Sequence, residues 1–489
     1  MSYFSEELVL SQLNNATCPD KSQDISYLPI SPTVPRIVHF LWCSDKGFKF
    51  NNYLSVLSSM KYLKPERITF HYITLPRREK FNYYDSWFEE LLQNVALFQP
   101  TKISSDRVCN TSNIKRQYVV GILQTEGGIY VEESTIFKED MEHLFKTTKT
   151  VKLGNDGTGY VSTVGKDLKV SDLVSNRTTQ PCPSFEEVTK IGSCFSIRKR
   201  VYPKTFWGLQ DVVGRTVNTI LYGTEIRPMP RSYDNKVIPN IAHVLWLRGK
   251  PVDFLFYLSC MSLIYVAEVE MLFVHGDVEP SGKYWIELKS ITNLRFVRIV
   301  FPNRVFNFTI RRLSHMSDVF RAMVLWKYGG IYSDVDVIWT QPISGDLFKH
   351  DAVASFDWAH AYYPYPDYLN LGVSMGKRGA PFWKKLISSF NDFRDSVFGY
   401  NGLLKPYKVY ERNPSLVFIH DRIQTMCFKN RCYPKGRPSN KDFRWNTDTF
   451  SYHWTWPTPV EFHNQSILFK INSTWADIGR NVLAKAGFK

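Results

Sequence analysis

The chain has 489 residues, of which 44% are hydrophobic, the share expected of a globular protein. The formal net charge is +15, but lysine and arginine are scattered without a run of five, which argues against a nucleic-acid-binding protein. A chain of this length is too long for one ordinary domain and suits two.

The N-terminal segment, residues 1–33, is polar and lacks the apolar core of a signal peptide, so we expect it to be a stem-like segment. Elsewhere no stretch reaches the roughly 18 apolar residues needed to cross a bilayer. If the protein works in a lumen, we therefore expect its membrane anchor or signal to be absent from this chain.

Short apolar runs read as strands, and helical patterns lie between them. The strand-like runs are 37–41, 68–73, 241–245, 269–274 and 294–299, and the clearest helical segment is 254–266. This alternation predicts an α/β protein with mostly parallel sheets, whose ligands bind at the carboxyl ends of the strands. The segment 202–234, with several prolines and glycines, includes the expected link between domains.

The chain contains an internal repeat. The sequence VPRIVHFLW at 34–42 returns as IPNIAHVLW at 238–246, which is 204 positions later. Gly-Gly-Ile-Tyr at 127–130 returns at 329–332, which is 202 positions later, and a shift of two residues is a change in loop length. Matches in the same order predict two tandem homologous domains. Their expected bounds are 34–225 and 236–485.

The stretch from Ser317 to Trp339 is the most informative part of the chain. Ser317 is an expected helix N-cap, and Gly329-Gly330 is expected to end that helix. Residues 331–339 then read as one strand that contains two aspartates.

Charged residues occur at regular spacing in this stretch. Asp318 and Arg321 are three apart and share one helical face, whereas Asp334 and Asp336 are two apart and share one face of a strand. Two carboxylates among aliphatic residues are costly unless a cation neutralises them, and Mn²⁺ or Mg²⁺ is the natural candidate. The alternative is an exposed strand end with solvated aspartates, but the Asp-x-x-Arg helix and the Tyr-Gly-Gly-Ile-Tyr turn favour a functional site.

The pattern S-D-x-x-R followed by Y-G-G-I-Y-x-D-x-D resembles the glycosyltransferase family with a DxD sugar-binding region. Its members include fungal α-1,6-mannosyltransferases, animal α-1,4-galactosyl- and N-acetylglucosaminyltransferases and, more distantly, the glucosylating domains of clostridial toxins. The resemblance covers 236–456 and, weakly, the first half. It implies the nucleotide-sugar transferase A-type fold, which is Rossmann-like. It also implies retaining, metal-dependent transfer of a hexose or N-acetylhexosamine from a nucleotide sugar, favoured to be a UDP-sugar, to a glycan acceptor.

The resemblance also implies roles for individual residues. Asp318 and Arg321 would hold hydroxyls of the transferred sugar, and Tyr332 would pack against the donor. Asp334 would contact the ribose and the sugar. Asp334 and Asp336 would both bind the metal.

Three further segments match the family. Trp246 ends the first strand of the second repeat and either stacks on the nucleotide base or is a core aromatic. Asn370 and Gly372 match the Asn-x-Gly segment near the sugar and the acceptor. His453 lies in a C-terminal His/Trp motif and either completes the metal or diphosphate site or is simply packed.

The first repeat lacks most of these residues. Shifted by 202 positions, Asp334 becomes Glu132, Asp336 becomes Ser134, Asp318 becomes Arg116 and Arg321 becomes Val119. We therefore expect the first domain to be a degenerate, catalytically inactive copy. Two other functions stay open: a carbohydrate-binding or scaffold protein without activity, and a toxin-like enzyme that modifies proteins in the cytosol.

Cysteines and glycosylation triplets bear on the compartment. No cysteines form a Cys-x-x-Cys pair, so zinc and thioredoxin-like chemistry lack support. Cys427 with Cys432, and Cys182 with Cys194, are close enough for local disulfides, and the alternative is free thiols in a reducing compartment. Asn-x-Ser/Thr triplets begin at Asn15, Asn110, Asn176, Asn307, Asn464 and Asn472. Together these features favour the lumen of the secretory pathway, with the Golgi as the expected location.

Overall fold

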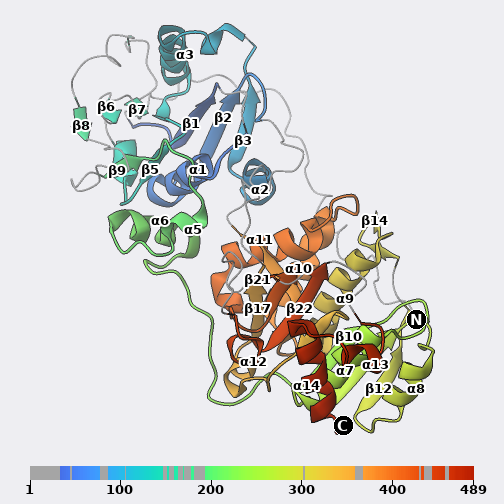
Figure 1. Ribbon diagram of the computed structural model, residues 1–489. Helices are drawn as coiled ribbons and strands as arrows, with labels where there is room; N and C mark the ends of the chain where they lie inside the picture. Colours follow the sequence, from blue (N-terminus) through green and yellow to red (C-terminus); the bar gives the residue numbers. More distant parts are fainter. Residues whose placement is uncertain are drawn as a thin grey trace.

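The computed structural model places the chain in two α/β units, each built on a seven-stranded sheet (Figure 1). The residues that it describes are 33–43, 47–76, 86–104, 106–146, 151–153, 159–162, 169, 178–180, 193–300, 303–357, 367–428, 431–433, 443–456 and 462–488. The predicted stem-like segment, 1–33, lies almost wholly outside them.

The first sheet has the strand order β3-β2-β1-β4-β7-β6-β8. Strands β3, β2, β1 and β4 run parallel, β7 runs antiparallel to both β4 and β6, and β8 is parallel to β6. The bounds are β1 (Ile37–Trp42), β2 (Arg67–Tyr72), β3 (Phe98–Lys102), β4 (Gly128–Val131), β6 (Val151–Leu153), β7 (Gly159–Ser162) and β8 (Thr178–Gln180). The helices are α1 (Phe50–Leu63), α2 (Ser86–Asn94), α3 (Ser112–Thr125), α5 (Pro203–Phe206) and α6 (Val212–Tyr222).

The second sheet has the order β12-β11-β10-β15-β18-β17-β19, with the same sequence of parallel and antiparallel neighbours. The bounds are β10 (Ile241–Leu245), β11 (Met271–Gly276), β12 (Leu294–Arg298), β15 (Gly330–Ser333), β17 (Ala352–Phe356), β18 (Leu369–Gly376) and β19 (Phe418–Ile419). The helices are α7 (Phe254–Tyr265), α8 (Lys283–Lys289), α9 (Leu313–Tyr328), α10 (Pro381–Ser389), α11 (Lys405–Arg412), α12 (Trp445–Asp448), α13 (Gln465–Leu468) and α14 (Thr474–Lys485).

Three smaller sheets are also found among the described residues. The one that bears on the site has the order β16-β22-β20-β21, with β16 (Val337–Trp339), β20 (Thr425–Phe428), β21 (Arg431–Tyr433) and β22 (Ser451–Trp456). The other two pair β5 (Thr135–Phe137) with β9 (Cys194–Ser196), and β13 (Arg304–Val305) with β14 (Phe308–Thr309). The pair β5–β9 occupies the same place after β4 that β16–β22 occupies after β15.

The predicted strand runs all fall on strands of the two large sheets, and the α/β prediction is confirmed. The run 241–245 coincides with β10, and the helical segment 254–266 coincides with α7 to within one residue. The segment 202–234 holds helices α5 and α6 before the chain enters the second unit.

Two local predictions around the DxD pattern are wrong. Ser317 is not an N-cap, because α9 begins at Leu313 and the Ser317 hydroxyl donates to the Ser314 carbonyl one turn back. The segment 331–339 is not one strand, because the chain leaves the large sheet after Ser333 and Val337 starts β16 against β22. The two aspartates therefore lie in a turn, and they do not share a strand face.

Pairs of buried histidines recur at the same place in both units. His243 Nε2 donates to the Gly329 carbonyl at 3.0 Å, so its Nδ1 accepts from His275 Nε2 at 3.0 Å. In the first unit, His39 makes the same two contacts with Gly127 and His71. A neutral tautomer of each histidine satisfies this arrangement. Burial lowers the pKa of His243 to about 4 and that of His275 to about 3.

We expect these pairs to make the fold sensitive to acid. An unfolded histidine titrates near 6.5 and binds a proton as the pH falls, whereas His243 stays neutral in the fold until about pH 4. The contribution of the neutral, buried His243 to the free energy of unfolding is complete above pH 6.5. It decreases below that pH, by about 2 kcal/mol at pH 5. Urea unfolding at pH 7 and pH 5 measures this loss. NMR resonances of the His243 ring that titrate near 6.5 in the folded protein would contradict it.

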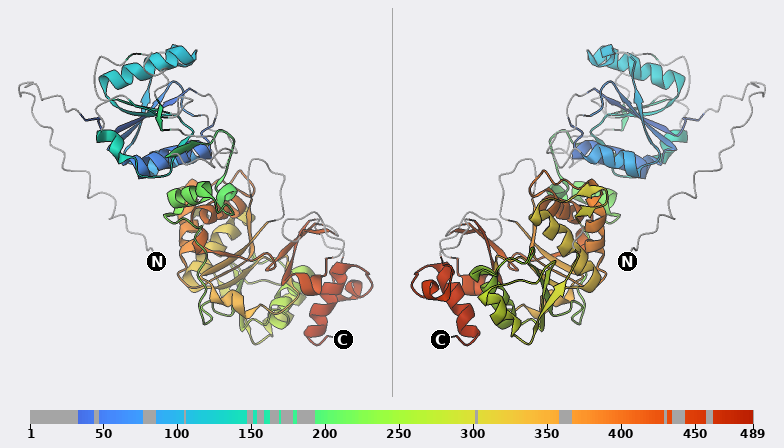
Figure 2. Two further views of the ribbon diagram at one scale, coloured as in Figure 1. Left: turned by 90° about the vertical axis from the view of Figure 1, so that its left-hand side faces the viewer. Right: turned by 90° about the vertical axis from the view of Figure 1, so that its right-hand side faces the viewer.

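The two units contact each other through α6 and α11. The Arg227 guanidinium lies 4.0 Å above the Trp207 ring, and Trp207 meets the edge of Tyr410 at 5.4 Å. The Tyr222 hydroxyl donates to the Glu411 carbonyl at 2.9 Å. Figure 2 shows α5 and α6, in green, between the first sheet and the second unit. The first unit is therefore docked on the helix α11 of the second.

Cysteine pairing and surface character can be followed in the described residues. Cys427 is bonded to Cys432, one of the two local pairs that the sequence spacing allows. Cys43 is bonded to Cys109, a pair that the sequence did not indicate. Cys194 is disulfide-bonded, and its predicted partner Cys182 lies outside the described residues.

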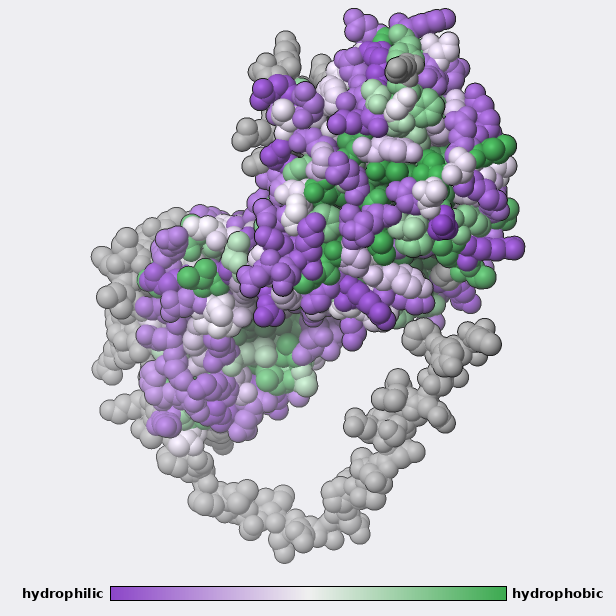
Figure 3. Space-filling model, turned by 90° about the horizontal axis from the view of Figure 1, so that it is seen from below, coloured by the Kyte–Doolittle hydropathy of each residue, from purple (hydrophilic) through white to green (hydrophobic). Residues whose placement is uncertain are grey.

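Hydrophilic residues cover most of the face in Figure 3.

Among the described residues, no helix is both long enough and apolar enough to cross a bilayer.

Candidate active site

The site forms where β15 ends and the chain turns into the small sheet. Gly330 has a φ of 101°, and a Cβ on it would lie 2.5 Å from the Ile241 carbonyl oxygen, so only glycine lets β15 approach β10 this closely. After Ser333 the backbone N–H of Asp334 donates to the Gly372 carbonyl at 2.7 Å. The N–H of Val337 donates back to the Asp334 carbonyl at 3.2 Å, which closes the turn.

Arg321 holds Asp334 from helix α9. Its two terminal nitrogens each lie 3.2 Å from one carboxylate oxygen of Asp334, which is a bidentate pair. The Tyr332 hydroxyl donates to the same carboxylate at 2.8 Å, and the guanidinium lies 4.7 Å from the Tyr332 ring centroid. Arg321 is 7% exposed, so this pair is fixed in one orientation with little solvent screening.

Asp318 lies on the other side of Arg321. Its carboxylate is 3.4 Å from the guanidinium, and the side chain is 13% exposed. Burial raises the pKa of Asp318 to about 6, although the guanidinium opposes that rise. Gly402 packs directly on this carboxylate, since a Cβ there would come within 2.3 Å of Oδ1. The structure thus brings Asp318, Arg321, Tyr332 and Asp334 together, as the sequence led us to expect.

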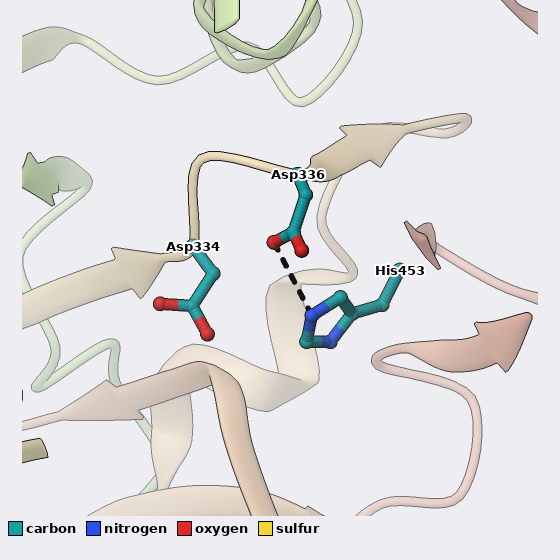
Figure 4. Close-up of side chains that lie close together, drawn as sticks. All are labelled: Asp334, Asp336 and His453. Carbon is teal, nitrogen blue, oxygen red and sulfur yellow. Dashed lines mark ion pairs between the residues drawn. The ribbon is translucent and has the colours of Figure 1, made fainter. Parts of the chain in front are cut away.

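Asp334, Asp336 and His453 form a cluster that could hold a metal ion. One ligand atom from each lies within 4.8 Å of the others, and His453 Nε2 is 3.3 Å from Asp336 Oδ1. Figure 4 shows the three side chains converging from the β15–β16 turn and from β22. Two carboxylate oxygens and one imidazole nitrogen suit Mn²⁺ or Mg²⁺ and leave positions for phosphate oxygens. The residues present therefore fit the predicted ion.

His453 reaches the cluster because β22 pairs with β16. Its position opposite Val337 in that ladder brings it beside the turn from more than a hundred residues away in sequence. Burial opposes the charged imidazolium, but the nearby carboxylates of Asp336, Asp334 and Asp357 together outweigh burial and raise the pKa of His453.

Asn370 and Gly372 support the cluster from the buried strand β18. The Asn370 side-chain oxygen accepts from the Gly372 N–H at 2.8 Å. A Cβ on Gly372 would lie 2.2 Å from Cε1 of His453, so the imidazole occupies the space that a side chain would need. Asn370 is 7% exposed, and its polar atoms are used within the protein.

Trp246 is partly buried and packs face to face on Phe256, with ring centroids 4.4 Å apart. Its indole N–H donates to the Lys250 carbonyl at 2.9 Å. One face of the ring and its only donor are thus used by the protein, which favours the core-aromatic interpretation.

Sequence reasoning missed Gln424, which immediately precedes β20. Its side chain lies between His453 and Asn370, at 2.9 Å from the His453 Nδ1. No spacing or motif distinguishes this glutamine, because only the pairing of β20 with β22 brings it to the site.

The first unit has different side chains at the corresponding positions. Lys115 Nζ lies 3.0 Å from both oxygens of Glu132, and the Tyr130 hydroxyl donates to Glu132 at 3.0 Å, as Tyr332 does to Asp334. The residue opposite Thr135 in the β5–β9 ladder is Ser196, which stands where His453 stands in the β16–β22 ladder. Among the described residues of this unit, no group of three side chains that could hold a metal is found.

Comparison with known proteins identifies the segment around the site. Residues 263–354 match the model of the glycosyltransferase sugar-binding region containing the DXD motif. Glucan organizing enzyme 1 of Cryptococcus neoformans var. grubii is 19% identical over 203 residues, which are 39% of this chain and 55% of that protein. The chain thus spans about half the length of this curated relative.

Two solved structures that part of the chain resembles are glycosyltransferases. The galactosyltransferase LgtC, in complex with donor and acceptor sugar analogues, shares 15% identity over 51% of this chain and 96% of its own, with a TM-score of 0.34. The glycosyltransferase GlyE of Streptococcus pneumoniae shares 10% over 51% of this chain and 64% of its own, with a TM-score of 0.30. Residues 263–354, which contain both aspartates of the DxD pattern, thus match the glycosyltransferase sugar-binding region containing the DXD motif.

Proposed function

We propose that the chain is a retaining glycosyltransferase that moves a hexose or N-acetylhexosamine from a UDP-sugar to a glycan acceptor. The observation that carries this proposal is the placement of the Asp334–Asp336–His453 cluster beside the buried Arg321–Asp318 pair. One group can hold a divalent ion, and the other offers charged hydrogen-bonding groups to sugar hydroxyls.

The residues of the site would have two kinds of role: some stabilise charge, and others orient the substrate. Asp334, Asp336 and His453 would hold Mn²⁺ or Mg²⁺, which when bound acts as a Lewis acid on the diphosphate of the leaving nucleotide. Arg321 and Tyr332 fix the Asp334 carboxylate, so that the carboxylate need not reorganise when charge develops. Asp318 and Arg321 orient the transferred sugar.

A glycosidase is a poorer fit to this site. Glycoside hydrolysis requires two carboxyl groups on either side of the scissile bond, one of them held protonated as the acid. Asp334 is bound bidentately by Arg321, and Asp336 lies two residues further on in the same turn. Neither is placed as a separate acid.

Nucleotide release tests the proposal and separates it from a carbohydrate-binding scaffold. Purified protein incubated with a panel of UDP-sugars and Mn²⁺ should slowly release UDP even without an acceptor. A scaffold would bind sugars without releasing any nucleotide. The donor that is turned over fastest identifies the sugar.

We further propose that the first unit is a degenerate copy of the second that supports it. The shared strand order, the repeated histidine pair and the Tyr130–Glu132 contact support a common origin. Serines at 134 and 196 replace two of the three possible ligands, and Lys115 already neutralises Glu132.

We expect Glu132→Ala to leave transferase activity within a few-fold of that of the unaltered protein, because Glu132 belongs to the inactive copy. Steady-state UDP release measures this. A loss of about tenfold or more in kcat/KM, in a variant that keeps its Tm, would show that the first unit takes part in turnover.

For location we propose the lumen of the secretory pathway, in the Golgi. The side chains of Asn110, Asn307 and Asn472 are exposed, as glycosylation requires, and two disulfides form within the described residues. Glycans on these asparagines in the cellular protein would support the lumen and exclude a toxin-like role in the cytosol.

A further inference from the structure

A glutamine outside the DXD segment orients the histidine of the metal cluster. Gln424 Nε2 lies 2.8 Å from the backbone carbonyl oxygen of Asn370 and 2.8 Å from the Ser355 hydroxyl. A backbone carbonyl can only accept a hydrogen bond, so the amide nitrogen of Gln424 must face it. The amide oxygen therefore faces the other way, toward His453.

Asn370 is fixed in the same manner. Its side-chain oxygen accepts from the Gly372 N–H at 2.8 Å, and a backbone N–H can only donate. The Asn370 side-chain oxygen also lies 3.3 Å from Gln424 Nε2, which is compatible only with Nε2 as the donor. Two backbone groups thus determine the orientation of both amides.

The orientation of Gln424 determines the tautomer of His453. Gln424 Oε1 lies 2.9 Å from His453 Nδ1, and an amide oxygen accepts only, so Nδ1 must carry the hydrogen. In the neutral ring, Nε2 then holds the lone pair. That nitrogen faces Asp336 at 3.3 Å, inside the proposed metal cluster (Figure 4).

We propose that Gln424 is a positioning residue that presets His453 as an Nε2 metal ligand. The inference rests on the proposed function, because it requires that the cluster bind a cation. Gly372 completes the arrangement, since any side chain there would displace the imidazole. Hydrogen bonds to the second nitrogen of a ligating histidine commonly change metal affinity by about 10- to 100-fold when removed.

Gln424→Leu tests the inference. We expect Mn²⁺ affinity in the presence of UDP, measured by the EPR signal of free Mn²⁺, to fall about 10- to 100-fold. Mg²⁺ affinity should change less, because carboxylate and phosphate oxygens supply most of its ligands. The double variant His453→Ala/Gln424→Leu should bind Mn²⁺ no more weakly than His453→Ala alone, since Gln424 acts through His453.

Gln341→Leu is the matched control. Its amide also donates to a backbone carbonyl near β22, that of Thr449, but it does not touch His453. We expect this variant to keep the Mn²⁺ affinity of the unaltered protein.

Nitrogen-15 NMR of the unaltered protein, with His453→Ala to assign the resonances, tests the tautomer without any change at Gln424. In the metal-free protein, at a pH high enough to leave the imidazole neutral, we expect the hydrogen on Nδ1. A neutral ring with its hydrogen on Nε2, or unchanged Mn²⁺ affinity in Gln424→Leu, would overturn the inference. Absence of any metal binding by the unaltered protein would instead refute the proposed function.

Discussion

Asp336→Asn should reduce metal-dependent UDP release by at least about 100-fold. Asn keeps the size of the side chain, but it removes a negative charge from a cluster whose ligand atoms lie within 4.8 Å of one another. Arg321 pairs with Asp334, whereas Asp336 contacts His453, so replacement of Asp336 leaves the Arg321–Asp334 pair intact. The loss should therefore appear in metal affinity and turnover, with little change in Tm.

Asp346→Asn is the control for that variant. Asp346 lies in the same unit and pairs with Lys349 on the surface, where its side chain is 82% exposed. We expect normal metal affinity and normal turnover. Full activity in Asp336→Asn would mean that the acidic pair does not hold the ion that the reaction needs.

Arg321→Met should lower the free energy of unfolding by about 3–5 kcal/mol and abolish turnover. The guanidinium is the cation closest to both Asp318 and Asp334, at 3.4 and 3.2 Å. Removal of one partner from a buried ion pair leaves uncompensated charge, and here it leaves two carboxylates near each other. Urea unfolding at neutral pH measures the loss.

Arg295→Met is a comparable change at an exposed site. The Arg295 guanidinium donates only to nearby backbone carbonyls, so we expect a change of about 0.5 kcal/mol or less. If Arg321→Met lowers the free energy of unfolding by less than about 1 kcal/mol, solvent already screens Asp318 and Asp334. The inference that these residues form a preorganised donor site would then be wrong.

Much of the second unit follows from local sequence. The strand 241–245 is found from its apolar run, and the end of helix α9 is found from Gly329, whose φ of 73° favours glycine. Asp318 and Arg321 are found because three residues separate them on one helix. These features depend on chain neighbours, which a sequence displays directly.

Features that depend on strand pairing between residues far apart in the sequence could not be predicted. Val335 and Val337 continue the apolar pattern of β15, so the sequence suggested one strand. The chain turns there because β16 pairs with β22, far along the chain. The same pairing brings His453 into the cluster, and the pairing of β20 with β22 brings Gln424 behind it. Gln424 matches no motif, because its role lies in hydrogen bonds to groups on three other strands, β17, β18 and β22.

Binding of UDP-sugars to the purified protein, measured by calorimetry with and without Mn²⁺, tests the central claim most directly. If the turn after β15 holds a divalent ion that neutralises the nucleotide diphosphate, at least one UDP-sugar should bind with Mn²⁺ and lose most of its affinity when the ion is chelated. Equal affinity in both conditions, or no binding of any sugar nucleotide, would contradict it.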